Sequence, residues 1–263
     1  MNISAIKTVF FSPTGTSKKI IQAIAKGANN SVPIKHIDLT LPQHSTNITA
    51  TENELTIIAV PVYAGRVANL AKLRLKEVSG NNSPAILVVL YGNREFDDAL
   101  LELRDIAIKQ SFRVVAAAAF IGEHSFSTVE TPTGHGRPDQ NDLKIATDLG
   151  KSVMQKLSGD QVNPDIQMPG NFPYKEGMMN LPFTPVVDNE NCTECEECLS
   201  VCPSGAISLN EKIQINAEAC IFCCACVKAC PVEYISLKST PMEEKAKDLS
   251  ANCQERKEPQ LFF

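Results

Sequence analysis

The chain has 263 residues, of which 43% are hydrophobic, and this length suits one domain of about 150–200 residues with a smaller second domain. Its net charge of −5 is uneven: residues 188–238 hold eight acids and three bases, whereas residues 1–187 hold 17 acids and 18 bases. An acidic segment argues against nucleic acid as a partner, because phosphate binding needs a basic face.

The N-terminus has one lysine, Lys7, before the short apolar run from Thr8 to Phe11. This run is too short for the core of a signal peptide, and no small-residue cleavage site follows it. No other apolar run approaches the roughly 20 residues that are needed to cross a bilayer. We therefore expect a cytoplasmic protein without a membrane span.

Residues 1–157 alternate between short apolar strands and amphipathic helices. Continuous β-branched runs separated by helices indicate a parallel sheet that is covered on both faces. Five strands of this size match an α/β fold with the doubly wound strand order 2-1-3-4-5. The predicted strands are Ala5–Phe11, Ile34–Asp38, Leu55–Pro61, Ala85–Tyr91 and Val114–Ile121, and the predicted helices are Ser17–Ala28, Val67–Val78, Asp97–Lys109 and Asn141–Leu157.

The first strand leads into the loop Ser12-Pro13-Thr14-Gly15-Thr16-Ser17 and then directly into a helix. Four hydroxyls and a glycine at a helix N-terminus can hold a phosphate group, because amides and hydroxyls donate hydrogen bonds and the helix dipole favours an anion. The loop has no lysine, so it is not a nucleoside-triphosphate loop. By itself it is equally compatible with a simple helix cap.

Loops after the later strands should lie at the same edge of the sheet. Residues 61–66 and 91–98 each contain a glycine, which lets the backbone approach a flat ring closely. Tyr63 can stack on such a ring, and Asn93 can bond its polar edge. His124 follows the fifth strand, and it is either a solvated loop residue or a group that reaches a bound ligand.

Residues 158–187 contain prolines at 164, 169, 173, 182 and 185 and are predicted to be a linker. All ten cysteines come after residue 190. Clustered cysteines in a cytosolic protein point to metal rather than to disulfides. Two runs of C-x2-C-x2-C-x3-C-P lie 28 residues apart, Cys192, Cys195, Cys198 and Cys202 in the first and Cys220, Cys223, Cys226 and Cys230 in the second.

This spacing resembles that of bacterial two-cluster ferredoxins, in which the fourth cysteine of each run ligates the other cluster. The resemblance implies one [4Fe-4S] cluster on Cys192, Cys195, Cys198 and Cys230, and another on Cys220, Cys223, Cys226 and Cys202. Structural zinc is the alternative, but zinc has no use for the tandem Cys-Pro ending. Cys224 is interpreted as a small core residue and Cys253 as a free surface thiol.

The three loops of residues 1–157 resemble the FMN site of the flavodoxin family, with Thr16 and Ser17 where many members have Asn and Thr. The whole chain resembles the flavodoxin–ferredoxin fusion proteins of anaerobes. This implies a flavodoxin-like domain (1–157), a linker (158–187), an α+β ferredoxin domain with two [4Fe-4S] clusters (188–240) and a tail (241–263). The residues implied to bind FMN are Ser12, Thr14, Gly15, Thr16, Ser17, Pro61, Val62, Tyr63, Ala64, Gly65, Tyr91, Gly92, Asn93, Arg94, Phe96 and Asp97.

We therefore expect an electron-transfer protein that passes electrons between its clusters and FMN, and that converts between one-electron and two-electron transfer. An FMN-dependent reductase of a small molecule, fed by the clusters, is the first alternative, and a metal-stabilised binding module is the second. The acidic C-terminal segment predicts a redox partner with a basic docking patch. Self-association and the identity of any substrate stay open. The tail ends in the apolar residues Leu261, Phe262 and Phe263, which can dock on a domain or on a partner.

Overall fold

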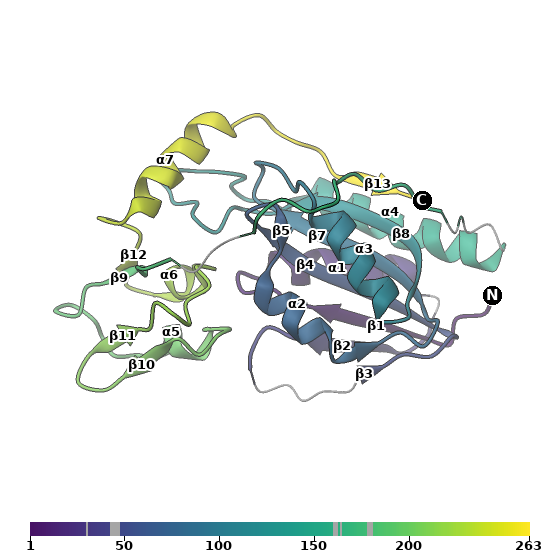
Figure 1. Ribbon diagram of the computed structural model, residues 1–263, viewed down its shortest axis with the longest axis horizontal. Coiled ribbons are helices and arrows are strands. Elements are labelled where there is room, and N and C mark those ends of the chain that lie inside the picture. Colours follow the sequence, from purple (N-terminus) through teal and green to yellow (C-terminus); the bar gives the residue numbers. More distant parts are fainter. Residues whose placement is uncertain (30, 43–47, 160–162, 164, 178–180) are drawn as a thin grey trace.

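The computed structural model describes residues 1–29, 31–42, 48–159, 163, 165–177 and 181–263 (Figure 1). The predicted linker lies partly outside these ranges, at residues 160–162, 164 and 178–180. Figure 1 shows a large α/β domain beside a small cysteine-rich domain, here called the cysteine domain. Among the described residues, no helix combines the length and the apolar character that a membrane span requires.

The α/β domain is built on five parallel strands in the order β2-β1-β4-β7-β8. The strands are β1 (Ala5–Phe10), β2 (Ile34–Asp38), β4 (Glu54–Tyr63), β7 (Pro84–Tyr91) and β8 (Arg113–Ile121). Every residue of β7 is buried, as expected for a central strand that is covered on both faces. The predicted fold and strand order are confirmed. From β1 the chain adds β2 on one side of the sheet and β4, β7 and β8 on the other, so the topological switch point lies between β1 and β4.

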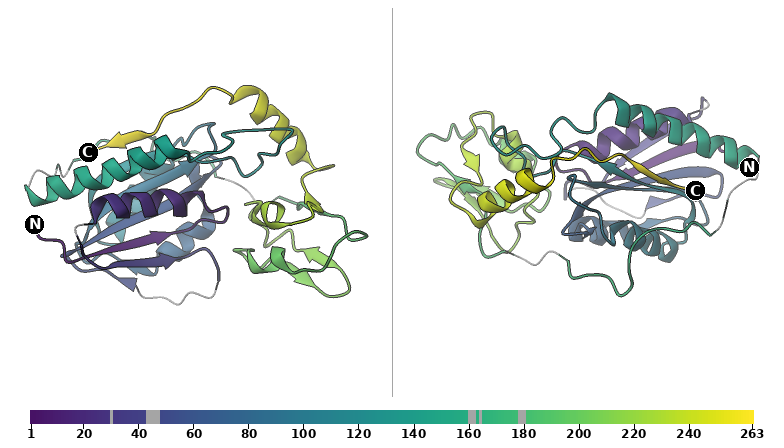
Figure 2. Two further views of the ribbon diagram at one scale, coloured as in Figure 1. Left: turned by 180° about the vertical axis from the view of Figure 1, so that it is seen from behind. Right: turned by 90° about the horizontal axis from the view of Figure 1, so that it is seen from above.

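Helices cover both faces of the sheet (Figure 2). They are α1 (Thr16–Ala28) and α4 (Gln140–Ser158) on one face, and α2 (Asn69–Leu75) and α3 (Ala99–Lys109) on the other. α1 and α4 approach each other through Gly27 and Gly150. A Cβ on Gly27 would lie 1.9 Å from the Thr147 carbonyl oxygen, and one on Gly150 would lie 2.1 Å from the Ile24 carbonyl oxygen.

The helix predicted at Val67–Val78 is shorter in the structure because both of its ends pair as strands. Val67 lies in β5 (Arg66–Val67) and pairs with Val62 of β4. Val78 lies in β6 (Val78–Ser79) and pairs with Ile48 of β3 (Ile48–Thr49). The helical spacing of apolar residues was therefore misleading at the two ends of the segment.

The cysteine domain has two short antiparallel strand pairs and two short helices. In chain order, one helix lies between β9 and β10 and the other between β11 and β12. β10 pairs with β11, and β12 pairs with β9. The elements are β9 (Val186–Val187), α5 (Glu197–Ser200), β10 (Ile207–Leu209), β11 (Ile213–Ile215), α6 (Ala225–Ala229) and β12 (Ile235–Ser236).

The C-terminal segment leaves the cysteine domain and returns to the α/β domain (Figure 1). It forms α7 (Pro241–Asn252), which is capped by the Thr240 side chain, and then β13 (Gln260–Phe262). β13 pairs antiparallel with β8, with Gln260 opposite Ala119. The strand was not expected, although docking of the apolar tail on a domain was one of the two possibilities raised by its sequence.

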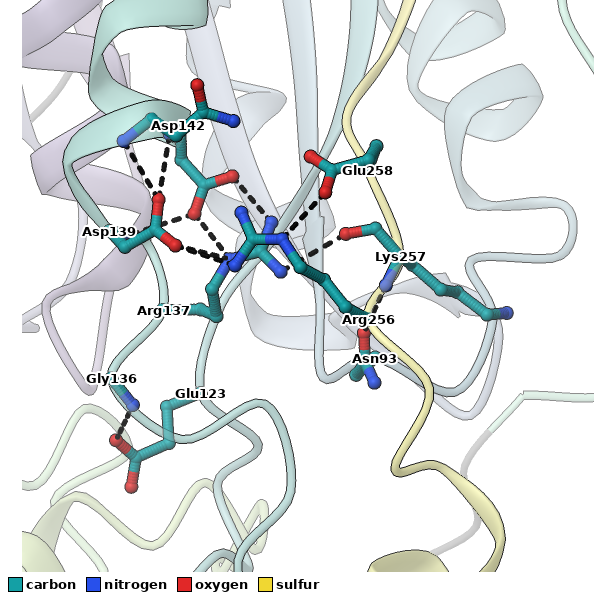
Figure 3. Close-up of polar contacts among 10 residues, drawn as sticks. Asn93, Glu123, Gly136, Arg137, Asp139, Asp142, Arg256, Lys257 and Glu258 are labelled. Carbon is teal, nitrogen blue, oxygen red and sulfur yellow. Dashed lines mark hydrogen bonds and ion pairs between the residues drawn. The ribbon is translucent and has the colours of Figure 1, made fainter.

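A buried ion pair holds the start of α4 and the C-terminal segment together (Figure 3). The Arg137 guanidinium donates to both carboxylate oxygens of Asp142, at 2.5 Å each, and to the carbonyl oxygen of Lys257 at 3.1 Å. Asp142 is fully buried and Arg137 is 7% exposed. Arg256 adds an ion pair of 2.7 Å to Asp139, the N-cap of α4. The loop from residue 131 to 139 is thus anchored at its end.

We expect Asp142→Asn to lower the free energy of unfolding by about 3–5 kcal/mol, because the Arg137 charge would stay buried without its partner. Urea unfolding measures this loss. Asp148→Asn is the matched control, since Asp148 lies on the same helix but pairs with Lys144 and Lys151 at the exposed surface. Equal effects of the two substitutions would contradict the structural role of the buried pair.

Candidate functional site

The loop between β1 and α1 can hold an anion. Gly15 is the N-cap of α1 and has a φ of 82°, in the left-handed region that favours glycine. Gly15 offers no side chain as a cap, and the first turn of the helix has no acidic residue to match the positive end of the helix dipole. The Ser17 hydroxyl is buried and has no hydrogen-bond partner among the described residues. A phosphate group would supply the missing partner for this hydroxyl and for the free amides.

Ser12 shapes this loop through two hydrogen bonds, and its hydroxyl keeps a hydrogen to donate. Its hydroxyl accepts a hydrogen bond of 3.0 Å from the Lys18 amide, and its own amide donates to the Thr40 hydroxyl at 2.9 Å. Ser12 is only 9% exposed. It therefore ties the end of β1 to the start of α1 and to the segment after β2.

A cleft, here called the loop cleft, opens beside the anion loop at the carboxyl ends of β1, β4, β7 and β8. Its empty volume is about 380 Å³. It is lined by Thr14, Thr16, Pro61, Val62, Tyr63, Leu90, Tyr91, Gly92, Gly122, Glu123, His124 and Ser125. Seven of these are residues predicted to bind FMN, so the fold brings the three predicted loops together at one edge.

A second, more apolar cleft, here called the interdomain cleft, lies between the two domains and has an empty volume of about 820 Å³. It shares Val62, Tyr63, His124 and Ser125 with the loop cleft. The other lining residues are Ala64, Arg94, Phe126, Leu181, Phe222, Met242, Lys245 and Leu249. The α/β domain, the cysteine domain and α7 therefore all contribute to its walls.

His124 lines both clefts and is held as a neutral ring. Its Nδ1 accepts a hydrogen bond of 3.0 Å from the Phe126 amide, so the proton of the neutral ring lies on Nε2. Burial lowers the pKa of His124 to about 4, and the charges of Arg94, Lys228 and Lys245 contribute. The ring needs glycine opposite it, because a Cβ on Gly92 would lie 2.2 Å from its Cδ2 atom. At neutral pH His124 is thus a hydrogen-bond donor without charge.

The two cysteine runs have the same backbone conformation. Residues with positive φ recur at matching positions, although five of the six are not glycine and such φ values are uncommon for other residues. The matched pairs are Glu194 (53°) with Phe222 (54°), Glu196 (60°) with Cys224 (56°), and Gly205 (64°) with Glu233 (57°). The sequence repeat is therefore also a structural repeat.

One set of cysteines lines a cavity, here called the cysteine cavity. This inner set consists of Cys202, Cys220, Cys223 and Cys226, so the fourth residue of the first run joins three from the second. Burial raises the pKa of the Cys223 thiol to about 12, and the neighbouring thiols of Cys202 and Cys220 add to the shift. The Ala206 amide donates to the Cys202 sulfur at 3.2 Å. Cys223 and Cys226 are buried, whereas Cys202 and Cys220 are partly exposed, and thiolates of such neighbouring cysteines can ligate iron.

The resemblance to two-cluster ferredoxins assigns Cys192, Cys195, Cys198 and Cys230 to a second set, here called the outer set. Cys198 is buried, whereas Cys195 is exposed. Burial raises the pKa of Cys198, and the thiols of Cys192 and Cys195 lie close enough to raise it further. In the described part of the chain no three His, Cys, Asp or Glu residues converge tightly enough for a single metal ion.

The inner set faces the α/β domain. Burial raises the pKa of Tyr63 well above its usual value, and the nearby thiols of Cys223 and Cys224 raise it further. The Phe126 and Phe222 rings meet edge to face, with centroids 6.2 Å apart. Two polar contacts also join the domains: Lys228 binds Glu123 at 2.8 Å, and Arg74 donates to the Pro203 carbonyl oxygen at 2.6 Å.

Several residues predicted to bind FMN line neither cleft. The Asn93 amide nitrogen donates to the carbonyl oxygens of Cys253 and Glu255, at 2.7 and 2.9 Å, so it holds the C-terminal segment instead of a ring edge. Phe96 is buried in the core against Tyr91. Gly65 and Asp97 pack on each other, and Asp97 pairs with Lys175. These side chains serve the loop structure.

The remaining candidates are also placed by the structure. Arg94 lines the interdomain cleft and pairs with Asp97. Cys224 is 1% exposed in an apolar cluster with Phe222 and lines the cysteine cavity. Cys253 is partly exposed just after α7. The sequence did not point to Phe222 or to the lining residues of α7, because nothing local signals a contact with a distant domain.

The C-terminal part of the chain matches known iron–sulfur proteins. Residues 184–231 match the family model of the 4Fe-4S dicluster domain. A 47-residue stretch is 45% identical to the pyruvate synthase subunit PorD of Methanocaldococcus jannaschii, covering 18% of this chain and 54% of that subunit. The chain thus spans about half the length of this curated relative.

Solved flavodoxins align with the α/β domain at low identity. A flavodoxin from the domain Archaea is 11% identical, covers 59% of this chain and 99% of its own, and has a TM-score of 0.39. Flavodoxin 1 from Bacillus cereus is 12% identical, with coverages of 58% and 98% and a TM-score of 0.42. The fold assignment itself rests on the strand order 2-1-3-4-5.

The chain joins a flavodoxin-like domain to a 4Fe-4S ferredoxin-like domain. The strand order decides the first part, and the dicluster match decides the second. The two parts meet at the edge of the sheet where flavodoxin-like folds bind their ligands.

We expect protonation of His124 to weaken the fold below neutral pH. The pKa of the ring is 6.5 in the unfolded chain and about 4 in the folded protein. Between these two pH values, the unfolded chain binds a proton on the ring that the folded protein does not bind. The contribution to stability is therefore intact above pH 6.5 and is lost as the pH falls toward 4. Urea unfolding at pH 7 and pH 5 should show a larger loss for the wild type than for His124→Gln. The same loss in both proteins would contradict the buried, neutral ring.

Proposed function

We propose that the chain is an electron-transfer protein that holds two [4Fe-4S] clusters in its cysteine domain and one FMN at the carboxyl edge of its sheet. The observation that carries this proposal is the contact between the two sites: Tyr63 lines both clefts and lies beside Cys223 and Cys224. Clusters pass single electrons, whereas a flavin exchanges one or two, so the pair converts between the two modes.

The α/β domain offers groups that suit both the phosphate and the ring system of FMN. The anion loop suits the phosphate, because the Ser17 hydroxyl has no partner among the described residues and the N-cap residue Gly15 has no side chain. The loop cleft leads from this loop to Tyr63, where the shared walls open into the apolar interdomain cleft. Such a surface suits a flat aromatic ring, and the His124 Nε2 hydrogen and nearby amides can bond its polar edge.

The two cysteine sets give the electron path a direction in space. The inner set lines the cavity beside the flavin site, and the outer set includes the exposed Cys195. Glu194, Glu196 and Glu197 surround Cys195 and are all exposed. We infer that a basic redox protein exchanges electrons with the outer cluster at this acidic face, and that the inner cluster exchanges them with the flavin.

Reduction of a small molecule at the flavin is a second candidate function, and the interdomain cleft favours it. The cleft is apolar, and two cationic residues, Arg94 and Lys245, lie on its wall beside the neutral His124. An apolar substrate with a negative group would match these walls. In this case the clusters would supply the electrons from the partner.

Protein purified without oxygen should contain one FMN and about eight iron and eight sulfide ions per chain. Cys202→Ser should lower the iron content by about half, because it removes one ligand from the inner set only. Cys253→Ser is the matched control, since it removes a thiol that lies outside both sets. Zinc in place of iron and sulfide would overturn the cluster assignment, and loss of iron in Cys253→Ser would overturn the ligand sets.

Electron exchange with a basic partner protein should slow as salt is added, because the docking charges are screened. The double variant Glu194→Gln, Glu196→Gln should slow the second-order rate at low ionic strength and reduce its dependence on salt. Glu52→Gln is the control, because Glu52 precedes β4 at the opposite end of the sheet from the clefts. Stopped-flow measurements of cluster reduction give these rates. An unchanged rate in the double variant would place the docking face elsewhere.

A further inference from the structure

One aromatic ring forms the wall between the two candidate redox sites. Phe222 lines the interdomain cleft on one side and the cysteine cavity on the other. It is 3% exposed and directly precedes Cys223 of the inner set. The interdomain cleft and the cysteine cavity therefore share Phe222 as a lining residue. It belongs to the cysteine domain and is the sequence neighbour of Cys223.

Contacts from both domains fix the ring in this place. Phe126 of the α/β domain meets it edge to face, and His124 in turn packs on Phe126 with ring centroids 4.9 Å apart. Phe183 packs on Phe222 from another side, at 5.5 Å and 76°. These arrangements are favourable for aromatic pairs and extend a continuous line of rings from the loop cleft to the cysteine cavity.

The structural repeat shows that the cysteine loop itself does not require an aromatic residue here. Phe222 has a φ of 54°, and its equivalent in the first run is Glu194, with a φ of 53°. Glu194 is exposed beside the outer set, whereas Phe222 is buried beside the inner set. The neighbouring pair differs in the same way, with Glu196 exposed and Cys224 buried. The same loop conformation thus carries exposed glutamates in the first cysteine run and buried Phe222 and Cys224 in the second.

We propose that Phe222 is the partition between the inner cluster and the flavin, and that it both carries the electronic contact between them and seals the cluster from molecules in the cleft. This inference rests on the proposed function. The exchange moves one electron at a time: the cluster that gives it up is oxidised, the flavin that receives it is reduced, and no bond forms or breaks. A packed ring couples the two sites better than a void, because a void removes the atoms in contact.

Phe222→Ala tests both parts of the proposal in the full-length protein loaded with clusters. In the first assay, 1,10-phenanthroline removes iron from the reduced clusters of protein prepared without FMN, and we expect iron loss to be several-fold faster than in the wild type. In the second, the protein also holds FMN, and we expect the rate of flavin reduction after rapid cluster reduction to fall several-fold. Phe222→Met, which refills the space, should restore both rates.

Leu237→Ala is the matched control, because Leu237 is a buried residue of the same apolar cluster, 6% exposed, but lines neither cavity. It should leave both rates close to those of the wild type. Unchanged rates in Phe222→Ala, or equal changes in Leu237→Ala, would overturn the partition. If Phe222→Ala loads fewer clusters, Phe222→Leu replaces it, with the same expected directions.

The two proposals can fail separately. Wild-type protein that binds clusters but no FMN would contradict the proposed function, and the chelator assay would then decide whether Phe222 seals the cavity. Wild-type protein with all of its cofactors and fast internal electron exchange, but with no response to Phe222→Ala, would uphold the function and reject the partition.

Discussion

The packing of the loop from Cys220 to Cys226 against the carboxyl edge of the sheet is the contact on which the rest of the structure depends. The loop presents Phe222 and Cys224, both almost fully buried, to Tyr63 and Phe126 of the α/β domain. Burial of these apolar side chains stabilises the arrangement of the two domains. It also decides which cysteine set lies beside the clefts and which remains at the surface.

Charge follows the same division. Cationic side chains gather around His124, where Arg94, Lys228 and Lys245 all act on its pKa. Exposed glutamates instead surround Cys195 at the outer set. A negative group in the cleft and a positive partner at the outer surface would each meet complementary charge. The molecule is thus electrically polar along the line that joins its candidate sites.

The sequence was informative wherever a local pattern decides the structure. The five strands and the helix after Gly15 follow from apolar periodicity and turn residues, and the cysteine spacing identifies the dicluster domain. The strand order follows from the match of five such strands to a doubly wound fold. Contacts between distant segments left no such signal. Asn93 lies in a loop where a ring edge was expected, yet it binds carbonyl groups about 160 residues away. β13 has only three residues in a charged tail, too few for a recognisable alternation.

Phe222 is a further example of this limit. Its position in the cysteine run gives the backbone conformation, since Glu194 shares it. Its burial depends on Phe126 and Leu181, which come from other parts of the chain. Inspection of the repeat could have raised the question, because a phenylalanine replaces a glutamate between matched ligands. Only the assembled fold shows what the ring separates.

Because β13 pairs with β8, the cysteine domain lies in the sequence between two strands of the same sheet. During synthesis from the N-terminus, β8 emerges long before its edge partner, and the whole cysteine domain is made in between. Until then the β8 edge has unpaired backbone groups that can pair with other chains. β13 can therefore complete the sheet only after the cysteine domain has been synthesised. If a ribosome stalls within that domain, the edge of β8 stays unpaired and can pair with another chain.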